Sequence, residues 1–181
     1  GSPTDVALAY FKTNDGIKTE MYLSGKLAAG YVRGIQSVGV SACPKHFAAN
    51  NQELRRMASN SVLDERTLRE LYLTSFEIAV KEGRPKCIMT SYNRVNGTYA
   101  NENHHLLQDI LHGEWGYDGA VVTDWGGSND HVEGVREGST LEMPCPGFGS
   151  AKRLMQAVEE GRLPESAVDA RVDELLELVF T

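Results

Sequence analysis

Five side chains that are suited to acting on a sugar stand directly after three apolar runs of the sequence. Lys45 and His46 follow the first run, Tyr92 follows the second, and Asp124 and Trp125 follow the third. Lysine, histidine and tyrosine can hydrogen-bond sugar hydroxyls, and an indole ring offers a flat apolar face to a pyranose. The carboxylate could attack an anomeric carbon as a nucleophile or act as a general base. These roles require that three separate segments of the chain converge.

Parallel strands would bring these segments together. We predict strands at 38–43, 86–91 and 119–123, and a fourth, brief strand at 141–143. The predicted helices cover residues 21–37, 64–82, 103–115, 129–137, 150–160 and 165–180. Alternating strands and helices favour a parallel sheet covered by helices. Because the carboxyl ends of parallel strands share one edge, the five side chains would line one pocket.

The number of strand–helix units limits the architecture. A closed (β/α)₈ barrel needs eight units and about 250 residues, whereas this chain has 181 residues and four predicted strands. The sequence therefore indicates an α/β fold of parallel (β/α) units, which form either a small open sheet or a partial (half) TIM-type barrel. A half barrel would leave two strand edges open, and open edges invite pairing with another chain.

Composition argues against two classes of partner. The net charge of −7 disfavours nucleic acid, which would require a basic face. No apolar run approaches the roughly 18 residues of a membrane span, so no membrane partner is expected. No cofactor or metal is expected either, because the cysteines form no zinc-binding spacing: Cys43, Cys87 and Cys145. The compartment stays open, although an odd number of cysteines leans toward a reducing one and so toward the cytoplasm.

Four segments agree in order and spacing with one known family. They read KHFAANNQE at 45–53, MTSYNRVNG at 89–97, GAVVTDW at 119–125 and LEMP at 141–144. From about Tyr22 to Thr181, the chain resembles glycoside hydrolase family 3. Its AANN after Lys-His-Phe differs from the Pro-Gly-His-Gly of the hexosaminidase branch, and so resembles the β-glucosidase-like branch. The resemblance implies the C-terminal half of the family's barrel domain at 22–181, preceded by an unaligned N-terminal segment at 1–21.

The resemblance also implies roles for individual residues. Asp124 would be the catalytic nucleophile of a retaining enzyme and would form a covalent glycosyl–aspartate intermediate with a β-glucoside or a short β-linked oligosaccharide. Tyr92 would lie beside this nucleophile, and Met89 and Arg56 are further candidates for the pocket wall. The residues implied in substrate binding are Lys45, His46, Tyr92, Trp125, Met89 and Arg56.

Parts of the family's site have no counterpart in this sequence. The first half of the barrel and the separate domain that carries the acid/base glutamate are missing. Retaining hydrolysis needs two carboxyl groups about 5–5.5 Å apart, and neither Glu53 nor Glu142 has motif support as the second one. We therefore expect a homodimer, or association with the missing half of a larger enzyme, and weak or absent turnover by the isolated chain.

Other readings of the same residues stay open. Asp124 could be a structural cap on the turn that follows it. The chain could be a non-catalytic sugar-binding or assembly module. It could also be a small open-sheet α/β protein of unrelated function.

Overall fold

The computed structural model describes residues 17–145 and 147–180 of the chain. Most of the predicted N-terminal segment 1–21 therefore lies outside the described residues. The α-helices are α2 (Ile17–Gln36), α3 (Glu65–Thr67), α4 (Thr74–Ile78), α5 (His131–Glu137), α6 (Phe148–Glu159) and α7 (Glu165–Phe180). The π-helical or 3₁₀ segments are η1 (Leu68–Leu73), η2 (Ala79–Gly83), η3 (Ala100–Glu102) and η4 (His105–Glu114). The strands are β1 (Asn60–Ser61), β2 (Cys87–Met89), β3 (Arg94–Val95), β4 (Thr98–Tyr99) and β5 (Ala120–Val122).

Each predicted helix is present, with ends that differ by a few residues. The helix predicted at 64–82 is one helical stretch from Glu65 to Gly83, in which α3, η1, α4 and η2 follow one another without a break. Asp64 caps its start, because the carboxylate accepts a hydrogen bond from the N–H of Thr67 at 2.8 Å. Arg84 ends the stretch in a left-handed conformation with a φ of 52°.

The central sheet is parallel, as predicted. β2 and β5 pair in parallel, with Cys87 opposite Ala120 and Met89 opposite Val122. Segment 42–47 hydrogen-bonds to one side of β2, and Leu141 forms a parallel bridge to Val122 on the far side of β5. Four chain segments therefore run side by side in the order of the sequence, which is the arrangement that (β/α) units produce. This confirms an α/β fold with parallel strands.

The first predicted strand is wrong in its position. Residues 38–43 form no strand, and the contact with β2 instead runs through Ala42, Pro44 and Phe47. The physical reason is burial, since Val38 and Val40 are exposed and find no core to pack against. The segment that carries Lys45 and His46 is nevertheless tied to β2. Its peptide bonds Lys45–His46 and Phe47–Ala48 are cis.

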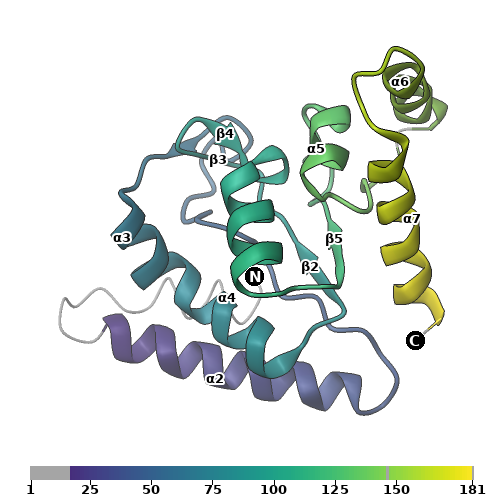
Figure 1. Ribbon diagram of the computed structural model, residues 1–181. Helices are drawn as coiled ribbons and strands as arrows, with labels where there is room; N and C mark the ends of the chain where they lie inside the picture. The colour runs from purple at the N-terminus through teal and green to yellow at the C-terminus, as the bar shows by residue number, and fades with distance from the viewer. Residues whose placement is uncertain (1–16, 146, 181) are drawn as a thin grey trace.

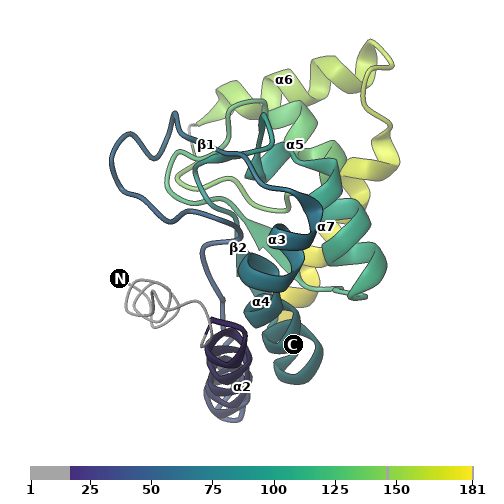
Figure 2. The same cartoon turned by 90° about the vertical axis from the view of Figure 1, so that its left-hand side faces the viewer.

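Several helices pack to one side of the sheet. In Figure 2, α3, α4, α5 and α7 gather to one side of β2, while the coil between α2 and α3 loops out on the other. Figure 1 shows β2 and β5 side by side, with α7 running along β5. Ile88 and Val121 are fully buried in the main core, together with the rings and aliphatic side chains of Phe47, Phe76, Leu106, Leu107, Ile110, Leu111 and Trp115. Because side chains alternate along a strand, Cys87 and Met89 face the opposite side.

A short second sheet lies beside this core, in the strand order β1-β3-β4. β3 and β4 are antiparallel, and the turn predicted at Asn96 and Gly97 joins them with φ angles of 52° and 98°. The Asn96 side chain also exchanges hydrogen bonds with the backbone of Leu63, which anchors the turn.

The face of helix α2 that is buried against the rest of the fold is not the one that carries its large apolar side chains. Among residues 20–36 of this helix, the buried ones are Met21, Gly25, Ala29 and Val32. The four-residue stripe of larger apolar side chains is mostly exposed: Leu23, Leu27, Tyr31 and the partly buried Ile35. The small residues allow α2 to approach α4 and η2 closely, so the apolar stripe remains on the surface of the described chain. No helix in the described ranges has the length and apolar character needed to cross a membrane.

Candidate active site

The Asp124 carboxylate lies directly after β5 and is held at both of its oxygens. Oδ1 accepts a hydrogen bond from the N–H of Trp125 at 2.7 Å. Oδ2 lies 3.3 Å from Nε2 of His46, which comes from the segment bonded to β2. Both side chains are largely buried, with 15% of His46 and 16% of Asp124 exposed. The Asp124 side chain thus bonds to the backbone of the next residue and also faces a residue from another segment.

Tyr92 joins this pair from the chain after β2. Its ring is buried, and its hydroxyl donates a hydrogen bond to the backbone oxygen of Trp125 at 2.8 Å. Burial raises the pKa of the phenol, and the negative charge of the nearby Asp124 carboxylate raises it further. The phenol is therefore a neutral hydrogen-bond donor that fixes the backbone next to Asp124.

Arg56 reaches the same cluster from the coil before β1. Its guanidinium carbon lies 4.7 Å from the centre of the Tyr92 ring, a cation–π arrangement. Its Nη1 also binds a carboxylate oxygen of Glu53 at 2.7 Å. The structure therefore brings together four of the residues singled out from the sequence: His46, Arg56, Tyr92 and Asp124.

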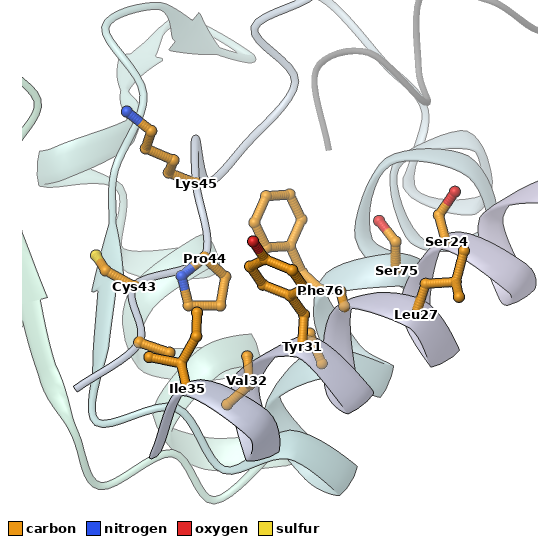
Figure 3. Close-up of a pocket in the computed structure, with 13 residues that line it drawn as sticks. Ser24, Leu27, Tyr31, Val32, Ile35, Cys43, Pro44, Lys45, Ser75 and Phe76 are labelled. Atoms are coloured by element: carbon orange, nitrogen blue, oxygen red, sulfur yellow. The ribbon is translucent and has the colours of Figure 1, made fainter. Parts of the chain in front are cut away.

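The side chains of the other three predicted site residues are partly or largely exposed. Met89 ends β2 and is partly buried opposite Val122. The indole of Trp125 is 63% exposed, so its face is open to solvent. Lys45 is partly buried, and its side chain extends away from Tyr31 and Phe76 in Figure 3.

One buried carboxylate near this site gave no signal in the sequence. Glu102 is buried, and its Oε1 accepts hydrogen bonds from the N–H groups of Asn129 at 2.8 Å and Asp130 at 2.7 Å. Burial raises the pKa of Glu102, against the opposite effect of these two donors. The interaction anchors the loop that leads away from Asp124. No local pattern around residue 102 indicates it, because the two partners lie 27 and 28 positions further along.

The two remaining acidic candidates are engaged elsewhere. Glu53 is exposed and paired with Arg56. Glu142 lies 3.2 Å from Nδ1 of His131, and both side chains are largely buried. Burial lowers the pKa of His131. Among residues 17–145 and 147–180, no three His, Cys, Asp or Glu side chains are placed to share a metal ion.

An apolar groove of about 440 Å³ lies apart from this cluster. It runs between α2, residues 42–45 and the α4–η2 stretch. Figure 3 shows Tyr31 and Phe76 across from Pro44 and Cys43 in its walls. Lys45 is the one predicted site residue in its lining. The groove is therefore a separate feature of the fold.

Comparison with known proteins gives one consistent family. Residues 11–178 match the glycosyl hydrolase family 3 N terminal domain. The chain is 50% identical over 159 residues to thermostable beta-glucosidase B of Acetivibrio thermocellus, covering 88% of this chain and 21% of that protein. It is 45% identical over 166 residues to beta-glucosidase B of Emericella nidulans, and the match covers 91% of this chain and 20% of that protein.

The fold comparison agrees with the sequence comparison. The structure of beta-glucosidase 3B from Thermotoga neapolitana in complex with glucose superposes with a TM-score of 0.85 at 41% identity. The match covers 88% of this chain and 23% of that one. This chain spans about a fifth of the length of the curated relatives that it matches.

Proposed function

The chain belongs to glycosyl hydrolase family 3, and we propose that it supplies the nucleophile side of a retaining β-glucosidase active site. The observation that carries this proposal is the meeting of His46, Tyr92 and Asp124. These side chains come from three separate chain segments, which follow residues 42–45, β2 and β5. They lie together at the carboxyl-terminal edge of the parallel sheet. The named beta-glucosidases among its relatives support a β-glucoside or a short β-linked oligosaccharide as substrate.

Asp124 is the proposed nucleophile. One carboxylate oxygen attacks the anomeric carbon, the glycosidic bond breaks, and the leaving oxygen takes a proton from a separate acid. Water then attacks the glycosyl–Asp124 ester, gives up a proton to the same group, and releases the sugar with its anomeric configuration retained. The N–H of Trp125 and the ring of His46 orient the carboxylate for the first step.

The surrounding residues are proposed to hold the sugar. Lys45 and His46 would donate hydrogen bonds to its hydroxyls, and the open indole of Trp125 would cover its apolar face. Arg56 and Met89 would form parts of the pocket wall. Tyr92, whose hydroxyl is already engaged by the backbone of Trp125, would keep the nucleophile loop in place.

The acid/base carboxyl is proposed to come from outside this chain. Retaining enzymes place it about 5–5.5 Å from the nucleophile. Glu53 is exposed and forms an ion pair with Arg56. Glu142 is largely buried beside His131, and its Oε2 accepts no hydrogen bond within the described residues. The described contacts of both glutamates are therefore with other side chains and not with Asp124. The isolated chain would accordingly show weak turnover or none.

We propose the same incompleteness for the fold. Residues 22–181 would be the C-terminal half of a (β/α)₈ barrel, preceded by the N-terminal segment 1–21, of which residues 17–21 begin helix α2. The remaining strands would come from a second copy of the chain or from further sequence. The exposed apolar stripe of α2 supports such an interface, since large apolar side chains on a surface mark contact sites.

A fluorinated glucoside tests the proposed nucleophile. The 2-deoxy-2-fluoro sugar slows hydrolysis of the glycosyl ester, so the assembled enzyme should accumulate it on Asp124, where peptide mass spectrometry locates it. Asp124→Asn should remove the label and lower kcat by roughly 10⁴-fold or more. Asp118→Asn is the matched control, because Asp118 is exposed and lies six residues earlier. This variant should keep the label on Asp124 and an unchanged kcat. A label on another residue would overturn the assignment.

A non-catalytic sugar-binding or assembly module is the second candidate. The observation that favours it is that Glu53 pairs with Arg56 and Glu142 lies against His131, so the described contacts of neither carboxylate are with Asp124. Hydrolysis of an aryl β-glucoside by the purified chain, abolished by Asp124→Asn, would exclude this candidate. Sugar binding without turnover, in the chain and in its assemblies, would favour it.

A further inference from the structure

Cys43 and Cys87 bring two thiols into contact at the base of the sheet. Their Sγ atoms are 3.2 Å apart, and the thiol of Cys43 donates a hydrogen bond to the sulfur of Cys87. Both are free cysteines. The N–H of Cys87 bonds to the oxygen of Ala42, which places Cys87 opposite Cys43 on the neighbouring parallel segment. The two side chains therefore point to the same face.

This geometry is close to that of a disulfide. Neighbouring strands lie about 4.7–4.9 Å apart, and disulfides span Cα separations of about 4.4–6.8 Å. The sulfurs need to approach by only about one ångström to reach bonding distance. We propose that Cys43 and Cys87 form an oxidation site at which a hydroperoxide produces an intramolecular disulfide. The inference does not depend on the proposed hydrolase function.

Cys43 and Cys87 differ in their exposure to solvent and in the direction in which their pKa values are shifted. Cys43 is partly exposed and lines the apolar groove beside α2 (Figure 3). Cys87 is 9% exposed, so only a small oxidant such as hydrogen peroxide reaches its sulfur. The hydrogen bond from Cys43 lowers the pKa of Cys87, against the effect of burial. That hydrogen bond and burial raise the pKa of Cys43. The direction of the hydrogen bond favours proton loss at Cys87 over Cys43, so the proposal assigns the attack on the peroxide to Cys87 and the second step to Cys43.

The reaction balances with one molecule of peroxide. The Cys87 thiolate attacks one peroxide oxygen, the O–O bond breaks, and the departing hydroxide takes up a proton to become water. Cys87 is then a sulfenic acid. The sulfur of Cys43 attacks the sulfur of Cys87, the S–O bond breaks, and the hydroxyl leaves as water with the proton of Cys43. Two thiols are oxidised by two electrons, and the peroxide is reduced to two waters.

The full 181-residue chain is the material for the test. The folded protein is treated with hydrogen peroxide, then denatured and alkylated with iodoacetamide, and its intact mass and peptides are measured. We expect one alkylated cysteine, Cys145, and a linked pair of peptides containing Cys43 and Cys87 that dithiothreitol separates. The matched control Cys145→Ser should form the same link. In Cys43→Ser, dimedone should capture the sulfenic acid on Cys87.

Three results would overturn the proposal. Alkylation of all three cysteines after peroxide treatment would mean that the buried pair does not react. A link that involves Cys145, or that joins two chains, would place the chemistry elsewhere. Formation of the Cys43–Cys87 link at the same rate in concentrated urea would show that the folded contact contributes nothing.

Discussion

At the scale of single residues, Tyr92 holds the backbone beside the proposed nucleophile. Its buried hydroxyl donates to the oxygen of Trp125, so Tyr92→Phe removes the donor and leaves that oxygen without its partner. We expect a loss of about 1–2 kcal/mol in the free energy of unfolding, measured by urea denaturation. Tyr31→Phe is the matched control, because Tyr31 is exposed on α2. An equal, near-zero change in both variants would contradict the assigned role of Tyr92.

Two kinds of signal in the sequence predicted the residues of the candidate site. Arg56 was predicted by the family resemblance, whereas the three residues that gather with it were predicted by their position after an apolar segment. His46, Tyr92 and Asp124 each follow an apolar segment, and parallel strands place such positions at one edge. Glu102 has no such signal, because its function depends on backbone N–H groups that the folded loop delivers from residues 129 and 130. Lys45 follows the same segment as His46 and borders the groove beside α2, although its side chain extends away from Tyr31 and Phe76 (Figure 3). The position of a residue after a strand predicts which edge of the sheet it occupies, and its contacts have to be read from the structure.

At the scale of elements, the small size of Gly25 allows one face of α2 to pack closely against α4. A Cβ on Gly25 would lie 2.8 Å from Cβ of Ile78, whereas one on Gly34 would meet nothing within 4 Å. We expect Gly25→Ala to lower the free energy of unfolding by about 1–3 kcal/mol through overpacking. Gly34→Ala should raise it by about 0.5–1 kcal/mol, because alanine favours a helix interior. Thermal and urea denaturation measure both, and the same sign for the two variants would contradict this packing.

The face of α2 could not be read from hydrophobicity alone. The helix carries two stripes, one of large side chains that includes Leu27 and Tyr31, and one of smaller residues that includes Gly25 and Ala29. Hydrophobicity favours the first stripe, whereas close approach to Ile78 and Gly83 requires the second. Strand 38–43 was misplaced for a related reason. Its valines are apolar, yet no neighbouring element covers them.

A pH-dependent link joins η4 to the start of the α3 stretch. Nδ1 of His105 lies 2.9 Å from Asp109, and Nε2 lies 3.0 Å from Glu65. These carboxylates raise the pKa of His105 in the folded chain, with the hydrogen bond to Asp109 as the largest cause. The folded state therefore binds the proton more tightly than the unfolded state. Its stabilisation is complete below the ordinary histidine value of about 6.5 and is lost as pH rises through the folded value.

His105→Gln should reveal this link. The wild-type chain should exceed the variant in free energy of unfolding between about pH 5 and 6.5, and the difference should shrink as pH rises further. Urea denaturation at a series of pH values measures it. His112→Gln is the control for loss of a histidine, since His112 bonds to the backbone oxygen of Tyr117 and not to a carboxylate. A difference for His105→Gln that grows with pH would reverse the sign and refute the argument.

At the scale of the whole molecule, the alternation of strands and helices predicted the fold class. The order and spacing of four sequence segments predicted the family. Parallel pairing of β2 and β5, flanked by residues 42–47 and Leu141, agrees with the predicted (β/α) units. Membership of glycosyl hydrolase family 3 removes the alternative of an unrelated open-sheet protein. The sequence does not predict whether its sheet edges and the α2 stripe are covered, because a surface contact depends on the partner as well as on this chain.

The α2 stripe is therefore where assembly should be tested. Leu23, Leu27 and Tyr31 of this stripe are 56–67% exposed, and burying the exposed part of each against a partner would contribute roughly 1–2 kcal/mol. We expect the purified chain to sediment as a dimer at micromolar concentration, and Leu27→Glu to shift it to monomer, because a carboxylate in that contact would be buried unpaired. Met155→Glu changes an equally exposed residue on α6 and should leave the dimer intact. If the wild-type chain stays monomeric at every concentration tested, the proposed self-association through this stripe is wrong.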